Sequence, residues 1–84
     1  MENRENDIVR DPLFFEAGKL IFEKRRTTFG LIQRSFKVGF SRALIIMDQL
    51  ENAGVIGPEA FVRDREILMS LEQFEKLYGE NGNV

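Results

Sequence analysis

The sequence predicts a small, mainly helical domain of the winged helix-turn-helix class: three helices, a two-stranded β wing and a short C-terminal helix. Three observations support this class. Apolar residues recur at spacings of three and four in three segments between residues 13 and 53. A short turn containing Gly39 joins the second and third segments, as in a helix-turn-helix. Two short β-prone segments then flank a turn, which is the element order of a winged helix.

The first two helices begin at capping signals. Asp11 followed by Pro12 offers a side-chain acceptor and then a proline, so a helix is expected from there to about Arg25. Thr28 can cap a shorter helix that ends at Phe36. The residues expected to face inward are Leu13, Phe14, Ala17, Leu20 and Ile21 in the first helix, and Phe29, Ile32 and Phe36 in the second.

The third helix is expected from about Phe40 to Ala53, because Gly54 can adopt the left-handed conformation that closes helices. Glu51 falls near the apolar side, where we expect a structural ion pair. The inward face is expected to hold Phe40, Ala43, Leu44, Met47 and Leu50. The outward face is expected to hold Ser41, Ile45, Asp48, Gln49 and Asn52, with Arg42 on the flank.

The rest of the chain supplies the wing and a last helix. Residues 55–56 and 65–68 are expected as two short β segments, the first confined to an edge by Pro58. Ser70 and Gln73 have capping-box spacing before a helix that runs to Tyr78. The residues expected to pack it onto the core are Leu71, Phe74, Leu77 and Tyr78. Residues 1–10 and 79–84 are expected to be flexible ends of a single domain, residues 11–78.

Composition excludes several functions. The chain has no Cys and no His, so disulfides, thiolate zinc sites and the usual general base are absent. No catalytic residue, cofactor or metal is expected, and the chain is not expected to be an enzyme. No apolar run approaches the roughly 20 residues that span a bilayer, so we expect a cytoplasmic chain without membrane contact.

The charge is unevenly distributed along the chain. The net charge is −2, but residues 10–42 carry eight Lys/Arg against three Asp/Glu, and residues 43–84 carry three against eight. A domain polarised in this way can turn one basic face toward phosphates while its net charge stays acidic. The alternative is that these are ordinary solvated surface charges.

Eight residues are candidates for contact with double-stranded DNA: Arg34, Lys37, Ser41, Arg42, Ile45, Asp48, Arg63 and Arg65. Basic side chains can neutralise phosphates, and Arg42 can also fork onto a guanine. Asp48 can accept from a cytosine amino group, and Ile45 can touch a thymine methyl. Structural roles stay open as well: a local cap for Ser41, a solvated charge for Asp48, and an ordinary charged turn for Arg63 and Arg65.

The segment "FEKRRTTFGLIQRSFKVGFSRALIIMDQLENAGVIGP" followed by "REIL" resembles the C-terminal gamma domain of the FtsK/SpoIIIE DNA translocases. The resemblance covers about residues 13–68 without a gap. The shared pattern comprises Gln33-Arg34, Phe36, Val38-Gly39, the aromatic at 40, Arg42-Ala43, Glu51 and Ala53-Gly54-Val55, with residues 65–68 matching the family's "REVL".

The resemblance implies a non-catalytic winged helix that reads a short, G-rich, directional chromosomal sequence. Such a domain orients a translocase motor in chromosome segregation and cell division, with several copies side by side on DNA. Ser41 stands where the family often has an asparagine that reads DNA, Arg42 matches the family arginine, and Asp48 stands for its specificity glutamate. Ile45 departs, since many members have an arginine there. The wing tip also departs, with Phe61-Val62 in place of the family's glycines.

Two functional hypotheses follow. The first is a sequence-reading DNA-binding module. The second is a winged helix that contacts a protein, such as a translocase motor domain or a XerD-like recombinase, without specific DNA readout. The chain contains no GxxxxGK[ST] phosphate loop and therefore no motor, so it is either an excised domain or a free-standing relative.

Overall fold

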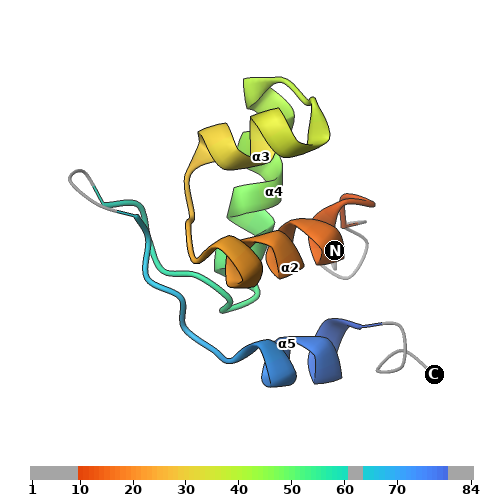
Figure 1. Ribbon diagram of the computed structural model, residues 1–84, viewed down its shortest axis with the longest axis vertical. Helices are drawn as coiled ribbons and strands as arrows, with labels where there is room; N and C mark the ends of the chain where they lie inside the picture. Colours follow the sequence, from red (N-terminus) through yellow and green to blue (C-terminus); the bar gives the residue numbers. More distant parts are fainter. Residues whose placement is uncertain (1–9, 61–63, 80–84) are drawn as a thin grey trace, which may run out of the picture.

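A computed structural model describes residues 10–60 and 64–79 of the chain, which form four helices and the loops between them. The helices are α2 (Phe14–Lys24), α3 (Phe29–Phe36), α4 (Phe40–Asn52) and α5 (Leu71–Tyr78). Helix α4 packs against both α2 and α3, and α5 packs against α2 (Figure 1). This arrangement places the start of α4 and the helix α5 at opposite ends of the domain (Figure 1).

Three helix ends follow the sequence signals. Thr28 Oγ1 accepts a hydrogen bond from the Leu31 N–H at 3.1 Å, and α3 runs to Phe36 as expected. Ser70 Oγ accepts from the Gln73 N–H at 3.0 Å and begins α5. Helix α4 ends at Asn52, and Gly54, two residues later, has a φ of 81° that allows the Val55 N–H to reach the Leu50 carbonyl at 2.9 Å. These predictions are confirmed.

The first helix begins later than the sequence predicted. Helix α2 begins at Phe14 rather than at Pro12. Asp11 Oδ1 accepts the Leu13 N–H at 2.8 Å, and the Asp11 carbonyl accepts the Phe14 N–H at 2.8 Å. Residues 11–13 therefore form a side-chain-closed turn ahead of the helix, because the carboxylate satisfies a backbone donor within the turn.

Most of the residues predicted to face inward lie in the core or pack against it, but the buried face of α4 differs from the predicted one. Ile46 is fully buried although neither predicted face included it, whereas Phe40 is 54% exposed and Leu44 is 37% exposed. The inward stripe is thus turned toward Ile46, because α2 and α3 both pack on that side of α4. The buried residues are Phe14, Ala17, Ile21, Phe22, Ile32, Ala43, Ile46, Met47, Leu50, Val55, Ile56 and Phe74.

Helix α5 docks through one aromatic face. Phe74 is fully buried, and its ring stacks on that of Phe15 with the centroids 5.2 Å apart. The Tyr78 hydroxyl donates to the Ala53 carbonyl at 3.3 Å. Leu71 and Leu77, expected to face inward, are 39% and 51% exposed. The short helix has room for only one contact stripe, and its aromatic residues occupy that stripe.

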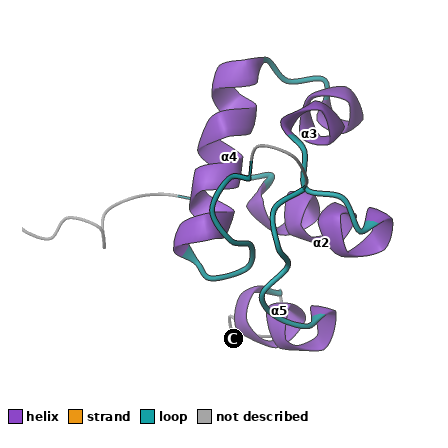
Figure 2. Cartoon of the chain, turned by 90° about the vertical axis from the view of Figure 1, so that its left-hand side faces the viewer, coloured by secondary structure: helices purple, strands orange, loops and turns teal. Residues whose placement is uncertain are grey.

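The predicted two-stranded wing is reduced to a single bridge within the described residues. Ile56 and Ile67 form an isolated antiparallel bridge, and no strand occurs in residues 10–60 or 64–79 (Figure 2). The Gly57 N–H donates to the Glu66 carbonyl and the Leu68 N–H to the Val55 carbonyl, both at 2.8 Å. Pro58 has no N–H with which to extend this ladder. Residues 61–63, where the tip was predicted, lie outside the described residues.

None of the described helices is long and apolar enough to cross a membrane.

Candidate nucleic-acid interface

The turn between α3 and α4 sets the geometry of the candidate interface (Figure 2). Lys37 ends α3 in a left-handed conformation with φ of 56°, and Gly39 precedes the first turn of α4. No side chain caps α4, and its first turn contains no acidic residue. The first backbone N–H groups of α4 are therefore available at the positive end of the helix dipole, where an anion is stabilised.

Five of the eight candidate DNA contacts are exposed around this turn and along α4. Arg34 lies in the last turn of α3, Lys37 in the connecting turn and Ser41 in the first turn of α4. Ile45 is 51% exposed, and Asp48 is exposed one turn further along the helix. Arg34, Lys37 and Ser41 thus lie near the uncapped start of α4 in the chain, whereas Ile45 and Asp48 lie further along the exposed face of that helix.

Arg42, the sixth candidate, is held in a two-point ion pair. Its Nε donates to Asp11 Oδ2 at 2.8 Å, and its Nη2 donates to Asp11 Oδ1 at 2.9 Å. The Asp11 N–H in turn donates to Gln49 Oε1 at 2.9 Å. The hydrogen bonds from Arg42 lower the pKa of the Asp11 carboxyl below its ordinary value, although partial burial opposes this. The same pair raises the pKa of Arg42.

Arg65, the seventh candidate, faces inward. Only 7% of the residue is exposed, its Nη1 lies 3.2 Å from Glu51 Oε1, and its guanidinium lies 5.4 Å from the centroid of the Phe29 ring. The ion pair expected for Glu51 is therefore confirmed. The side chain that was expected to reach DNA from the wing instead fixes the arm formed by residues 64–68 to α4. Arg63, the eighth candidate, lies outside the described residues.

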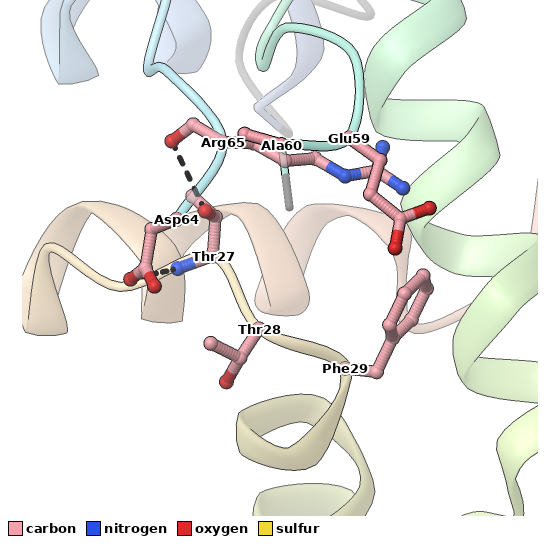
Figure 3. Close-up of a pocket in the computed structure, with 7 residues that line it drawn as sticks. All are labelled: Thr27, Thr28, Phe29, Glu59, Ala60, Asp64 and Arg65. Carbon is pink, nitrogen blue, oxygen red and sulfur yellow. Dashed lines mark hydrogen bonds between the residues drawn. The ribbon is translucent and has the colours of Figure 1, made fainter. Parts of the chain in front are cut away.

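A shallow hollow of about 140 Å³ lies beside this arm (Figure 3). Asp64 Oδ2 accepts from Arg26 Nε at 2.6 Å and from the Thr27 N–H at 3.1 Å. The Thr27 hydroxyl donates to the Arg65 carbonyl at 3.0 Å. These hydrogen bonds of Thr27 and Asp64 anchor the arm to the loop before α3. The lining residues are Thr27, Thr28, Phe29, Glu59, Ala60, Asp64 and Arg65.

Among the described residues, no group of three or more His, Cys, Asp or Glu side chains could hold a metal ion.

Sequence reasoning missed two features of this surface. Phe40 and Leu44 lie on the exposed face of α4 beside Ile45, and Phe40 packs only on one side, with its ring 5.2 Å from that of Phe29. Asp11 was interpreted as a helix cap and not as a partner of Arg42. No local signal could have revealed that pair, because its members are 31 residues apart.

The structure thus defines a small helical domain in which α4 presents an exposed face between two ion-paired flanks, one held by Asp11 and the other by Arg65. The family model described as the Ftsk gamma domain matches residues 9–70. The chain belongs to this family, which confirms the resemblance found in the sequence.

Named relatives agree with this assignment. The DNA translocase FtsK of Streptococcus pyogenes serotype M3 (strain SSI-1) is 47% identical over 60 residues, covering 71% of this chain and 8% of that protein. The FtsK of Staphylococcus epidermidis (strain ATCC 35984) is 42% identical over 65 residues, covering 77% of this chain and 8% of that protein. The DNA translocase SpoIIIE of Bacillus subtilis (strain 168) is 36% identical over 69 residues, covering 82% of this chain and 9% of that protein. The chain spans less than a tenth of the length of these relatives.

Proposed function

We propose that this domain is a non-catalytic module that binds double-stranded DNA and orients a DNA translocase in chromosome segregation. The proposal includes a winged-helix mode of binding, with α4 in the major groove and the hairpin between α4 and α5 beside it. The observation that carries it is the start of α4, which is uncapped, free of acidic residues and next to exposed Lys37 and Ser41, with exposed Arg34 in the last turn of α3. Membership of a family found in DNA translocases supports it.

The roles proposed for the side chains follow from their positions. Arg34 and Lys37, at the end of α3 and in the turn, would neutralise phosphates. Ser41, Ile45 and Asp48 lie on the exposed face of α4 and would meet base edges, so a directional motif would be read by this helix. We leave Arg65 out of the proposed interface because it is buried, and we retain Arg63 from the sequence prediction.

Binding to duplexes at two or more salt concentrations tests the proposal. We expect affinity to fall as salt rises, with a logarithmic slope of about −0.9 for each phosphate contact, because bound counterions are released. Arg34→Ala and Lys37→Ala should each weaken binding to all sequences about equally and make the slope shallower by roughly one. Fluorescence anisotropy with labelled duplexes of different sequence measures both quantities.

Lys76→Ala is the matched control, since Lys76 is an exposed basic residue on α5, at the opposite end of the domain (Figure 1). It removes the same charge and should leave the salt slope unchanged. If Lys76→Ala weakens binding as much as Lys37→Ala, only the net charge matters and the proposed face is wrong. If the wild-type chain binds no duplex at low salt, DNA binding itself is excluded.

A second candidate function is contact with a protein, for which the motor domain or a XerD-like recombinase are the partners that the sequence suggested. It is favoured by the three neighbouring apolar side chains Phe40, Leu44 and Ile45, which are 54%, 37% and 51% exposed. Leu44→Ser separates the two functions. It should leave the salt slope of duplex binding intact but abolish binding to a protein that covers this patch.

A further inference from the structure

The Asp11–Arg42 pair lies on the flank of α4 that borders its exposed face. Both carboxylate oxygens accept from the guanidinium, at 2.8 Å and 2.9 Å, so the contact is a two-point fork rather than a single charge contact. The two side chains differ in exposure: 45% for Arg42 and 10% for Asp11. The carboxylate is therefore almost covered, while much of the arginine still faces solvent.

Counting donors shows which part of Arg42 remains free of this pair. A guanidinium has five N–H groups. Asp11 engages the Nε–H and one N–H of Nη2. The N–H groups of Nη1 and the second N–H of Nη2 lie on the other edges of the plane. The edge formed by Nη1 and Nη2 is itself a fork of two parallel donors, the geometry that fits a phosphate or the O6 and N7 atoms of guanine.

Asp11 is itself fixed at three points. Its Oδ1 accepts the Leu13 N–H at 2.8 Å, its carbonyl accepts the Phe14 N–H at 2.8 Å, and its own N–H donates to Gln49 Oε1 at 2.9 Å. The last contact ties the residue to α4, the same helix that carries Arg42. The start of α2 therefore holds the carboxylate in a defined place relative to the exposed face of α4.

We propose that Asp11 is a positioning residue for DNA binding: it holds Arg42 so that its Nη1–Nη2 edge forms a preformed fork for an acceptor pair on DNA. This inference rests on the proposed DNA-binding function. An arginine that is already held in its binding orientation loses less conformational freedom when it binds. The opposing idea is that Asp11 masks Arg42 and that DNA must displace it.

The two ideas predict opposite signs for one substitution. Asp11→Asn removes a negative charge close to a polyanion, which by charge alone tightens binding. Its side-chain oxygen can still accept the Leu13 N–H, so the turn before α2 is retained. If Asp11 positions Arg42, Asp11→Asn weakens binding to the preferred duplex roughly three- to tenfold despite the lost repulsion. If Asp11 masks Arg42, the same variant binds more tightly.

A double-mutant cycle with Arg42→Ala makes the test specific. In the Arg42→Ala background Asp11 has no arginine to hold, so Asp11→Asn should then leave the affinity for DNA unchanged or raise it. Additive losses would mean that Asp11 acts only through the fold and would overturn the inference. Asp64→Asn is the matched control, because Asp64 pairs with Arg26 through the same atoms, at 2.6 Å and 3.4 Å. It removes one carboxylate from an Asp–Arg pair and should not weaken binding.

The Arg42 Nε–H resonance provides a readout that does not depend on affinity. It should be protected from solvent exchange in the free domain and stay protected in the duplex complex, while Asp11→Asn reduces that protection. Loss of protection when wild type binds DNA means that Arg42 leaves Asp11, and the inference is wrong. Failure of the wild-type chain to bind any duplex refutes the proposed function, whereas binding with a tighter Asp11→Asn variant refutes this inference alone.

Discussion

The ring of Phe74 in α5 lies directly over Gly18 in α2. A Cβ atom built at Gly18 would fall 2.3 Å from Cζ of that ring, closer than any real side-chain contact. Phe74 is fully buried and also packs against the rings of Phe14 and Phe22. The absence of a side chain at position 18 is therefore what allows the C-terminal helix to seat its main core residue.

Gly18→Ala should destabilise the domain although alanine is the better helix former. The helix propensity gain is at most about 1 kcal/mol, whereas overpacking a rigid aromatic contact costs about 1–3 kcal/mol. Subtracting the gain from the cost leaves an expected net loss of up to about 2 kcal/mol in the free energy of unfolding, measured by chemical denaturation.

Gly30→Ala in α3 is the control, because its Cβ would meet only the mobile tip of Arg34, at 2.9 Å from Nη1. That tip can move, so this variant should be neutral or slightly stabilising. A stabilised Gly18→Ala variant would mean that α5 does not dock as described.

Arg65 is expected to contribute to stability rather than to DNA affinity. Removing it strips Glu51 of its partner and empties a buried site beside Phe29. Since Glu51 keeps 39% of its side chain exposed, we expect Arg65→Ala to cost about 2–3 kcal/mol, below the usual range for a fully buried pair. Thermal melting checks this, and Arg26→Ala, at an exposed pair with Asp64, should lower the melting temperature much less. An Arg65→Ala variant that melts normally but binds duplexes weakly would restore the DNA contact predicted from the sequence.

Acid should destabilise the domain through Asp64 as well as Asp11. The hydrogen bond from Arg26, followed by that from the Thr27 N–H, lowers the pKa of Asp64 below its ordinary value of 3.8. The folded chain thus binds this proton less readily than the unfolded chain does. The stabilisation is complete well above pH 3.8 and is lost as the pH falls through the lower folded value. Denaturation curves between pH 6 and about pH 2 should show this loss, and Asp64→Asn should make the pH dependence shallower. An unchanged pH dependence in that variant would contradict the pairing.

Ile45 provides a test of base preference. Its side chain is 51% exposed on the face proposed to meet DNA, and it can offer no hydrogen bond to guanine. We expect the wild-type chain to prefer a G-rich duplex only weakly, and Ile45→Arg to gain about 1–3 kcal/mol of discrimination in favour of that duplex. The melting temperature should change little because the position is exposed.

Leu44→Arg is the control for this substitution, since it adds the same charge to the same exposed face one residue away. If it strengthens binding to G-rich and random duplexes as much as Ile45→Arg does, the gain is electrostatic and position 45 reads no base. Strong G-rich preference in the wild type would mean that other side chains carry the specificity.

The sequence by itself determined the local features of this protein. The caps at Thr28 and Ser70 and the glycine end of α4 all formed as predicted, because each depends on atoms within a few residues along the chain. The family could be identified for a related reason: its pattern is carried by one continuous segment of the chain, residues 9–70.

Only the tertiary structure decided which face of α4 is exposed and which charged side chains are paired. Ile46 rather than Phe40 or Leu44 entered the core, because the packing of α2 and α3 sets the rotation of α4 and the apolar stripe is broad enough to allow either. Asp11 pairs with Arg42, 31 residues away along the chain, and Glu51 pairs with Arg65, 14 residues away. A sequence states that an arginine is present but not which carboxylate lies within 3 Å of it, since that distance is fixed by the packing of helices far apart in the chain.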